Sequence, residues 1–281
     1  MPRQYTPTAT KKQTFSPALT PTKVHIFRSG LVVGACLTMF INGWLFVTQV
    51  YYIPSFFQLA YNMSAVKSGA LLLPITLTQT LSSTLSGLIV HWTGRYRESI
   101  IAGWAAWAIG LGCYSTLDPQ RFDLGKAIGY GLLTGFGVGQ TLQPSLIAIQ
   151  AGVARRDMAV VTCTRNFVRN LGSTLGLAVS ATLVNSALRS GLNGTGVSGT
   201  EFLDNSEAAL EGVSGGERDL VERLAVEGYA LGFRRMFYLN AALAALGCLL
   251  AVWLIPQIGL ERSDDSALRE KPEGGGSGKS G

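Results

Sequence analysis

Six long stretches without Asp, Glu, Lys or Arg divide the sequence, and this feature limits the fold more than any other. The stretches are 31–60, 68–92, 99–117, 127–154, 170–188 and 236–255. A helix needs about 20 apolar residues to cross the roughly 30 Å of hydrocarbon in a bilayer. Because backbone groups in lipid must bond within their own segment, each stretch is predicted to be a helix. We therefore expect an all-α, polytopic membrane helix bundle with six transmembrane helices.

The charge content agrees with a bilayer as the solvent. Charged residues make up 14% of the chain, against about 25% in an ordinary soluble domain. All 17 acidic residues lie outside the apolar stretches. The net charge of +6 follows from the loops of a membrane protein, so it does not require a nucleic-acid partner.

The predicted organisation has three parts: a polar cytoplasmic tail over 1–28, a six-span bundle over 29–256 and a disordered cytoplasmic tail over 257–281. Basic residues favour cytoplasmic loops. One set of short loops carries Arg95, Arg97, Arg155, Arg156, Arg165 and Arg169, and the other carries Lys67, Arg121 and Lys126. The first set is predicted to be cytoplasmic, and the loop 189–235 is then outside. Residues 217–232 are expected to form a short helix on the outer membrane surface or a lid on the bundle.

Small residues recur at every fourth position in two of the stretches. Gly131, Gly135 and Gly139 lie in the fourth stretch, and Gly172 and Gly176 lie in the fifth. This spacing is typical of closely packed membrane helices. Arg165 and Arg169 precede the fifth stretch, so they are expected where that helix leaves the cytoplasmic surface. Prolines 54, 74 and 144 weaken their helices and favour a bundle that rearranges, as in a pump, channel or transporter.

Amide side chains inside the stretches are the candidates for a substrate path: Asn42, Gln49, Gln79, Gln140 and Gln143. An amide that faces lipid is costly, so these groups are expected to face a cavity or one another. The alternative is that they make hydrogen bonds between helices. Trp44, Trp104, Trp107 and Trp253 are expected at the membrane interface or facing lipid rather than in a pocket.

Sites for catalysis are not predicted. The four cysteines lack metal-ligand spacing, and the two histidines are far apart. The sequence GFGVGQ at 135–140 lies inside an apolar stretch, and no Walker A pattern is present. We therefore expect no enzymatic activity, no metal and no cofactor. The expected partners are the lipid bilayer and a small-molecule substrate, without nucleic acid.

Four segments carry a resemblance to a known family. They are YYIPSFFQ at 51–58, SAVKSGALLLPI at 64–75, GLIVHWTGRYR at 87–97 and RNFVRNLGSTLGLA at 165–178. The chain resembles the C-terminal six helices of a major facilitator superfamily transporter, and it is most similar to the fungal fourteen-helix drug:proton antiporter group.

The segment 87–97 resembles the cytoplasmic loop motif of that superfamily. Gly87, Gly94, Arg95 and Arg97 match the motif, whereas His91 stands at its acidic position and Trp92 at its arginine position. The resemblance implies a basic loop that bonds to helix ends and biases the inward- or outward-facing state. The alternative is a loop that serves topology alone.

The resemblance implies one half of a secondary transporter. Paired with an N-terminal half or a homodimer mate, the chain is expected to export small organic molecules or drugs by proton antiport, in the plasma membrane rather than the vacuolar one. The alternative is a non-transporting six-helix protein that scaffolds or regulates a full-length relative, or an inactive product. A truncated gene model is the expected explanation for the missing half.

Overall fold

In a computed structural model, the structure describes residues 30–119, 121–153, 157–193, 195, 197 and 215–257. These residues form helices connected by short turns, without a strand among them. The helices are α1 (Gly30–Tyr61), α2 (Ala65–Ala70), α3 (Leu73–Thr93), α4 (Arg97–Tyr114), α5 (Leu124–Ala151), α6 (Met158–Gly191) and α9 (Gly215–Leu254). The all-helical prediction is therefore confirmed. The predicted N-terminal tail, nearly all of the C-terminal tail, Arg155 and Arg156 lie outside the described residues.

Local sequence signals explain where several helices begin and end. The Ser64 hydroxyl accepts a hydrogen bond from the Lys67 amide at 3.4 Å and caps α2. Asp123 caps α5 in the same way, accepting from the Lys126 amide at 3.2 Å. These side chains satisfy amides that have no partner within the helix. Gly94 ends α3 with φ of 68°, a left-handed conformation that glycine adopts without a steric penalty.

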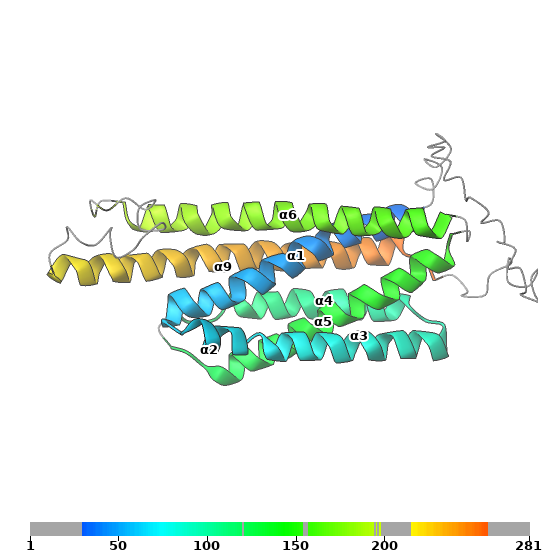
Figure 1. The fold of residues 1–281 in the computed structure, drawn as a ribbon, viewed down its shortest axis with the longest axis horizontal. Helices are drawn as coiled ribbons and strands as arrows, with labels where there is room; N and C mark the ends of the chain where they lie inside the picture. The colour runs from blue at the N-terminus through cyan, green and yellow to red at the C-terminus, as the bar shows by residue number, and fades with distance from the viewer. Residues whose placement is uncertain are drawn as a thin grey trace, which may run out of the picture.

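The long helices form an elongated bundle in which α1 runs obliquely across α6 and α9, and α5 runs obliquely across α3 and α4 (Figure 1). Helix α1 packs against α6 and α9, whereas α5 packs against α3 and α4. The two groups are joined by the contact of α4 with α9. The ends of α3 and α5 and the starts of α4 and α6 lie at the same end of the bundle as the start of α1.

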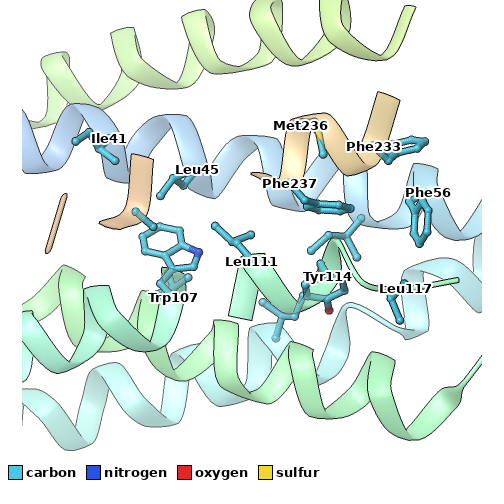
Figure 2. Close-up of a cluster of buried hydrophobic side chains, with 14 of the residues drawn as sticks. Ile41, Leu45, Phe56, Trp107, Leu111, Tyr114, Leu117, Phe233, Met236 and Phe237 are labelled. Atoms are coloured by element: carbon cyan, nitrogen blue, oxygen red, sulfur yellow. The ribbon is translucent and has the colours of Figure 1, made fainter. Parts of the chain in front are cut away.

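Aromatic side chains fill the centre of the bundle (Figure 2). Phe56 of α1 and Phe233 of α9 meet edge to face with ring centroids 5.2 Å apart. Phe237 of α9 stacks on Tyr114 of α4 at 5.5 Å. Such pairs contribute about 0.5–1.5 kcal/mol beyond the area that they bury. The cluster therefore holds the α1–α9 and α4–α9 contacts together.

The placement of two tryptophans differs from the prediction. Trp104 and Trp107 of α4 are fully buried, and their rings stack at 5.4 Å. The expectation of an interface or lipid-facing position was therefore wrong for them, because α4 is enclosed between α5 and α9. Trp253 of α9 is 85% exposed within the chain, as a lipid-facing residue would be.

Three of the described helices are long and apolar enough to cross a membrane: α1, α6 and residues Gly216–Leu254 of α9. Helices α3, α4 and α5 have 21, 18 and 28 residues. They are not among these three candidate spans. Six spans therefore remain our proposal.

The segment between the fifth and sixth apolar stretches also differs from the expected loop. Helix α6 continues to Gly191, and α9 begins at Gly215 and runs without a break for 40 residues. Residues 217–232 are thus the first turns of α9 and not a separate surface helix or lid. Val221, Ala225 and Tyr229 are buried along one side of these turns. These turns pack against α6, where Gly228 lies beside Leu188. This packing explains why α9 extends beyond the apolar stretch.

Candidate functional site

Two arginines of α6 extend into the bundle. The Arg165 side chain is only 5% exposed. Its Nη2 donates to the Leu142 carbonyl at 3.1 Å and to Ser145 Oγ at 2.9 Å, both on α5. Helix α6 begins at Met158, about two turns before Arg165, and the expected place of Arg165 at the membrane surface stays a prediction. Arg165 therefore bridges α6 and α5 from inside the bundle.

Arg169 connects three helices through Asn42. Its Nε donates to Asn42 Oδ1 on α1 at 2.9 Å, and its guanidinium lies over the Phe46 ring, 5.0 Å from the centroid. Asn42 Nδ2 in turn donates to Thr141 Oγ1 on α5 at 3.1 Å. Asn42 is fully buried. The chain of hydrogen bonds from Arg169 through Asn42 to Thr141 therefore joins α6, α1 and α5.

Neither arginine has an acidic partner in the part of the chain that the structure describes. The ion pairs there join Arg95 to Glu98, Lys126 to Asp123, and Arg218 to Glu222. An arginine at the centre of a membrane helix costs about 2.5–3.5 kcal/mol on insertion scales, and such residues generally mark a functional site. Arg165 and Arg169, two neighbouring cations bound only to neutral acceptors among the described residues, are therefore the strongest candidates for a functional site in the bundle.

Three of the five candidate amides make hydrogen bonds between helices. Gln49 Oε1 accepts from Trp107 Nε1 at 2.9 Å, which links α1 to α4. Gln140 Nε2 donates to Ser82 Oγ at 2.9 Å, which links α5 to α3. Asn42 has the two partners described above. For these residues the structure shows the alternative that the sequence left open, while a contact with substrate is untested.

The other two candidate amides have no partner side chain among the described residues. Gln79 of α3 is half-buried, and Gln143 of α5 is exposed within the chain. A Cβ at Gly87 would lie 3.3 Å from Gln143 Cγ, so Gln143 lies close to α3. The structure therefore does not bring the five amides together in one cavity.

Sequence reasoning missed two polar contacts. Trp44 Nε1 donates to Asn240 Oδ1 at 3.2 Å and links α1 to α9. The hydroxyls of Thr48 and Ser180 lie 3.4 Å apart and link α1 to α6. Asn240 lies near the start of its apolar stretch, so the sequence favoured an interfacial position for it. Its burial depends on α9 beginning much earlier than that stretch.

The predicted glycine positions lie where backbones approach closely. A Cβ on Gly172 would collide with the Phe40 carbonyl of α1, and one on Gly176 would lie 2.7 Å from Trp44 Cγ. In the same way Gly135 lies against the Ile75 carbonyl of α3. Gly139 lies against Gln79 and Ser82 of that helix, and Gly131 lies against Ile75. These approaches account for the tight α1–α6 and α3–α5 packing. Gly43, Gly103, Gly110 and Gly137 make comparable approaches that the spacing rule did not identify.

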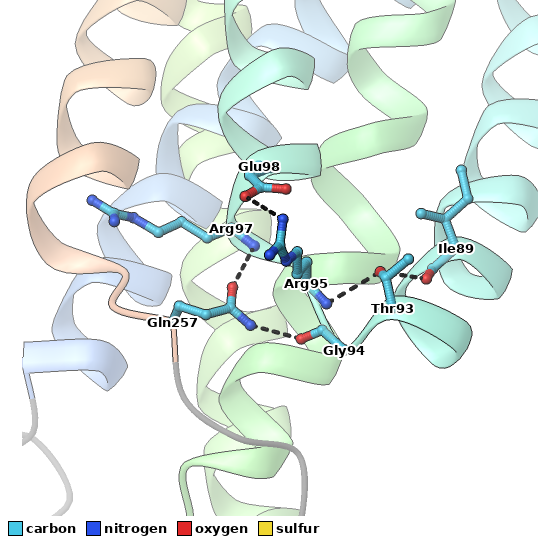
Figure 3. Close-up of polar contacts among 7 residues, drawn as sticks. All are labelled: Ile89, Thr93, Gly94, Arg95, Arg97, Glu98 and Gln257. Carbon is cyan, nitrogen blue, oxygen red and sulfur yellow. Dashed lines mark hydrogen bonds and ion pairs between the residues drawn. The ribbon is translucent and has the colours of Figure 1, made fainter.

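The loop that matches the family motif is tied to the end of α9 (Figure 3). Gln257 Nε2 donates to the Gly94 carbonyl at 2.6 Å, and Gln257 Oε1 accepts from the Arg97 amide at 3.2 Å. Arg97 Nη2 donates to the Val252 carbonyl at 2.7 Å, in the last turn of α9. A cation there is favoured by the helix dipole. Arg95 instead pairs with Glu98 at 3.6 Å on the exposed side, and Gly87 lies in α3.

Metal chemistry finds no support among the described residues. The four cysteines are free, and no three His, Cys, Asp or Glu side chains of the described part gather in one place. The polar groups of the bundle are instead amides, hydroxyls and guanidinium groups, which bind organic groups or anions through hydrogen bonds.

A helical bundle with lipid-length apolar helices and buried polar side chains defines an integral membrane protein. The chain is 33% identical to the MFS-type transporter clz4 of Cochliobolus lunatus over 229 residues, which cover 81% of this chain and 40% of clz4. It is 29% identical to the MFS-type efflux pump LUC4 of a Fusarium species over 255 residues, 85% of this chain and 45% of LUC4. No protein-family model matches it. The chain belongs to the major facilitator superfamily, and its relatives are fungal transporters.

A third relative is the MFS-type transporter ppz2 of Metarhizium majus, with 30% identity over 160 residues, which cover 57% of this chain and 28% of ppz2. The chain therefore spans less than half the length of each of these three relatives, from 28% to 45%.

Proposed function

We propose that the chain is the C-terminal six-helix half of a secondary transporter that exports small organic molecules or drugs by proton antiport. In this proposal six helices cross the plasma membrane, with both tails in the cytosol, and an N-terminal half or a homodimer mate supplies the second wall of the substrate path. Substrate sites in this class of transporter lie at the interface between repeats. The proposal is supported by the similarity to MFS-type transporters and efflux pumps.

The proposed pairing of this chain with a second transporter half is supported by a row of polar residues on the exposed side of α6. Asn166, Asn170, Thr174 and Thr182 are all exposed within the chain and follow a spacing of four or eight residues. Such residues lie on one side of a helix. Helix α3 presents a matching row of Thr76, Thr80 and Thr84 beside the exposed leucines 77, 81 and 85. Polar side chains in membrane helices face protein or a water-filled cavity rather than lipid. These two sides of the bundle are therefore the proposed contact with the second half.

A second candidate, a protein that scaffolds or regulates a full-length relative without transport, is favoured by a different observation. Helices α1, α3, α5 and α6 contain no Asp or Glu. A proton carrier within these helices would require such a group, because carboxylates and histidines form the proton relays of pumps and transporters. His91 is the one histidine in the four helices, and it lies in the last turn of α3.

Flux of a fluorescent amphipathic dye into proteoliposomes separates the two candidates. We expect no proton-linked flux from the monomeric chain and measurable flux from its homodimer or once the N-terminal half of clz4 is reconstituted with it. Asn170→Leu should reduce this flux by weakening the contact between halves, whereas Leu171→Ala, at the neighbouring exposed position, should have little effect. A chain that binds the added half without any proton-linked flux would support the scaffold and remove the transporter.

A further inference from the structure

We infer that Arg165 and Arg169 bind a carboxylate carried by the transported molecule, so that the substrate is an amphipathic organic acid. This inference rests on the proposed function, because it assigns a substrate class to the transporter. It also goes beyond the similarity to known proteins, whose names specify no charge on their cargo.

The first argument is charge balance. The two guanidinium groups lie four residues apart, on the same side of α6. Their acceptors in the described part of the chain are neutral: the Leu142 carbonyl, Ser145 Oγ and the Asn42 and Asn166 amide oxygens. A buried charge is costly unless an opposite charge pairs with it. An anion bound here would supply the missing negative charge.

The second argument is unused hydrogen-bonding capacity. Arg165 Nε is buried and has no acceptor, and Arg165 itself is 5% exposed. Arg169 uses Nε for Asn42, which leaves both of its terminal nitrogens free of acceptors in the described structure. A guanidinium presents its N–H groups as a planar fork that matches the two oxygens of a carboxylate. The site therefore offers donors in the geometry that a carboxylate needs.

The third argument concerns the rest of the ligand. The Phe46 ring lies 5.0 Å from the Arg169 guanidinium and is only partly covered by other residues. Val50 follows one turn later on α1 and is also half-buried. An apolar or aromatic body can pack here while its carboxylate reaches the arginines. Inorganic phosphate lacks such a body and loses more hydration on entering an apolar site, so we favour an organic acid.

Calorimetric titration of the detergent-purified 281-residue chain tests the inference. Benzoate is the probe, and benzamide and benzylamine are its neutral and cationic analogues. We expect benzoate to bind at least about tenfold more tightly than either analogue, because only the carboxylate accepts charge-assisted hydrogen bonds. Arg165→Gln and Arg169→Gln should each weaken benzoate binding about tenfold. The matched control Arg189→Gln alters an exposed arginine at the far end of α6 and should bind as the unaltered chain does.

Several results would overturn the inference. These are equal affinity for benzoate and benzamide, tighter binding of inorganic phosphate than of benzoate, and unchanged benzoate binding in both glutamine variants. Absence of benzoate binding by a chain with native helical circular dichroism would overturn it as well. If Arg165→Gln does not fold, Arg165→Lys keeps the charge without the fork, and it should retain the preference for benzoate with reduced affinity. If the chain binds benzoate through these arginines but gives no flux when reconstituted with the N-terminal half of clz4, only the transport proposal is refuted. Dye flux in that reconstitution without benzoate binding would refute only the carboxylate site.

Discussion

Arg169 donates from Nε to the Asn42 side-chain oxygen across the α6–α1 contact, at 2.9 Å. The same amide donates to Thr141 of α5. One buried side chain thus fixes a cation from one helix and a hydroxyl from another. This arrangement explains why an asparagine occupies the middle of the otherwise apolar helix α1, and it makes Asn42 the residue on which the polar interior depends.

We expect Asn42→Leu to destabilise the bundle by about 2–3 kcal/mol, because a hydrogen bond to a charged group contributes about 1.5–3 kcal/mol and Thr141 loses its donor as well. Thermal unfolding in detergent, followed by circular dichroism, measures the effect. Asn185→Leu is the control, since Asn185 is half-buried on α6 and has no hydrogen bond from its side chain in the described structure. Equal unfolding temperatures for the two variants would contradict the role of Asn42.

Gly172→Ala and Gly129→Ala should change stability in opposite directions. A Cβ at Gly172 would collide with the Phe40 carbonyl, whereas a Cβ at Gly129 would meet no atom within 4 Å. Overpacking costs about 1–3 kcal/mol, and alanine in place of glycine in a helix contributes up to about 1 kcal/mol. We therefore expect the unfolding temperature to fall for Gly172→Ala and to rise slightly for Gly129→Ala. A rise for both variants would show that α1 and α6 are not in close contact.

Trp107→Phe should cost about 1–3 kcal/mol because it leaves Gln49 Oε1 without its donor. Gln49 Nε2 already has no partner, so the amide would be wholly unsatisfied in the interior. Trp253→Phe, at an exposed position, should leave the stability unchanged. The comparison uses chemical unfolding in mixed micelles, and a larger effect at Trp253 than at Trp107 would reverse the assignment of buried and lipid-facing rings.

Gln257→Ala should loosen the turn between α3 and α4. The Gln257 amide accepts from the Arg97 backbone and donates to the Gly94 carbonyl. Loss of about 1 kcal/mol of hydrogen bonding corresponds to roughly fivefold faster hydrogen exchange at the Arg97 amide. Arg95→Gln removes only an exposed ion pair and should alter this exchange rate little. Unchanged exchange in Gln257→Ala would mean that the end of α9 does not hold this turn.

Much of the fold could be predicted because the bilayer imposes a simple rule. Uncharged stretches of about 20 residues predict helices, and the described helices cover most of each stretch. Glycines at every fourth position indicated close packing, and Gly172 and Gly135 do lie against neighbouring backbones. These inferences succeed because they depend on one helix at a time.

The candidate site was less predictable because it depends on which helices are neighbours. The sequence is compatible with Gln49 and Gln140 either facing substrate or bonding between helices. Only the tertiary structure shows that their partners are Trp107 and Ser82. The contacts of the arginines were unpredictable for a related reason. Arg165 reaches the Leu142 carbonyl and Ser145 Oγ only because α6 lies beside α5.

The sequence by itself determined that the chain is helical, built for a bilayer and similar to a transporter half, since hydropathy and motifs are properties of contiguous residues. Tertiary structure alone decided that Arg165 and Arg169 lie inside the bundle without a carboxylate partner among the described residues, and that Trp104 and Trp107 form part of the core. The physical reason is that burial and charge pairing arise between segments far apart in sequence, such as α1 with α6 and α4 with α9.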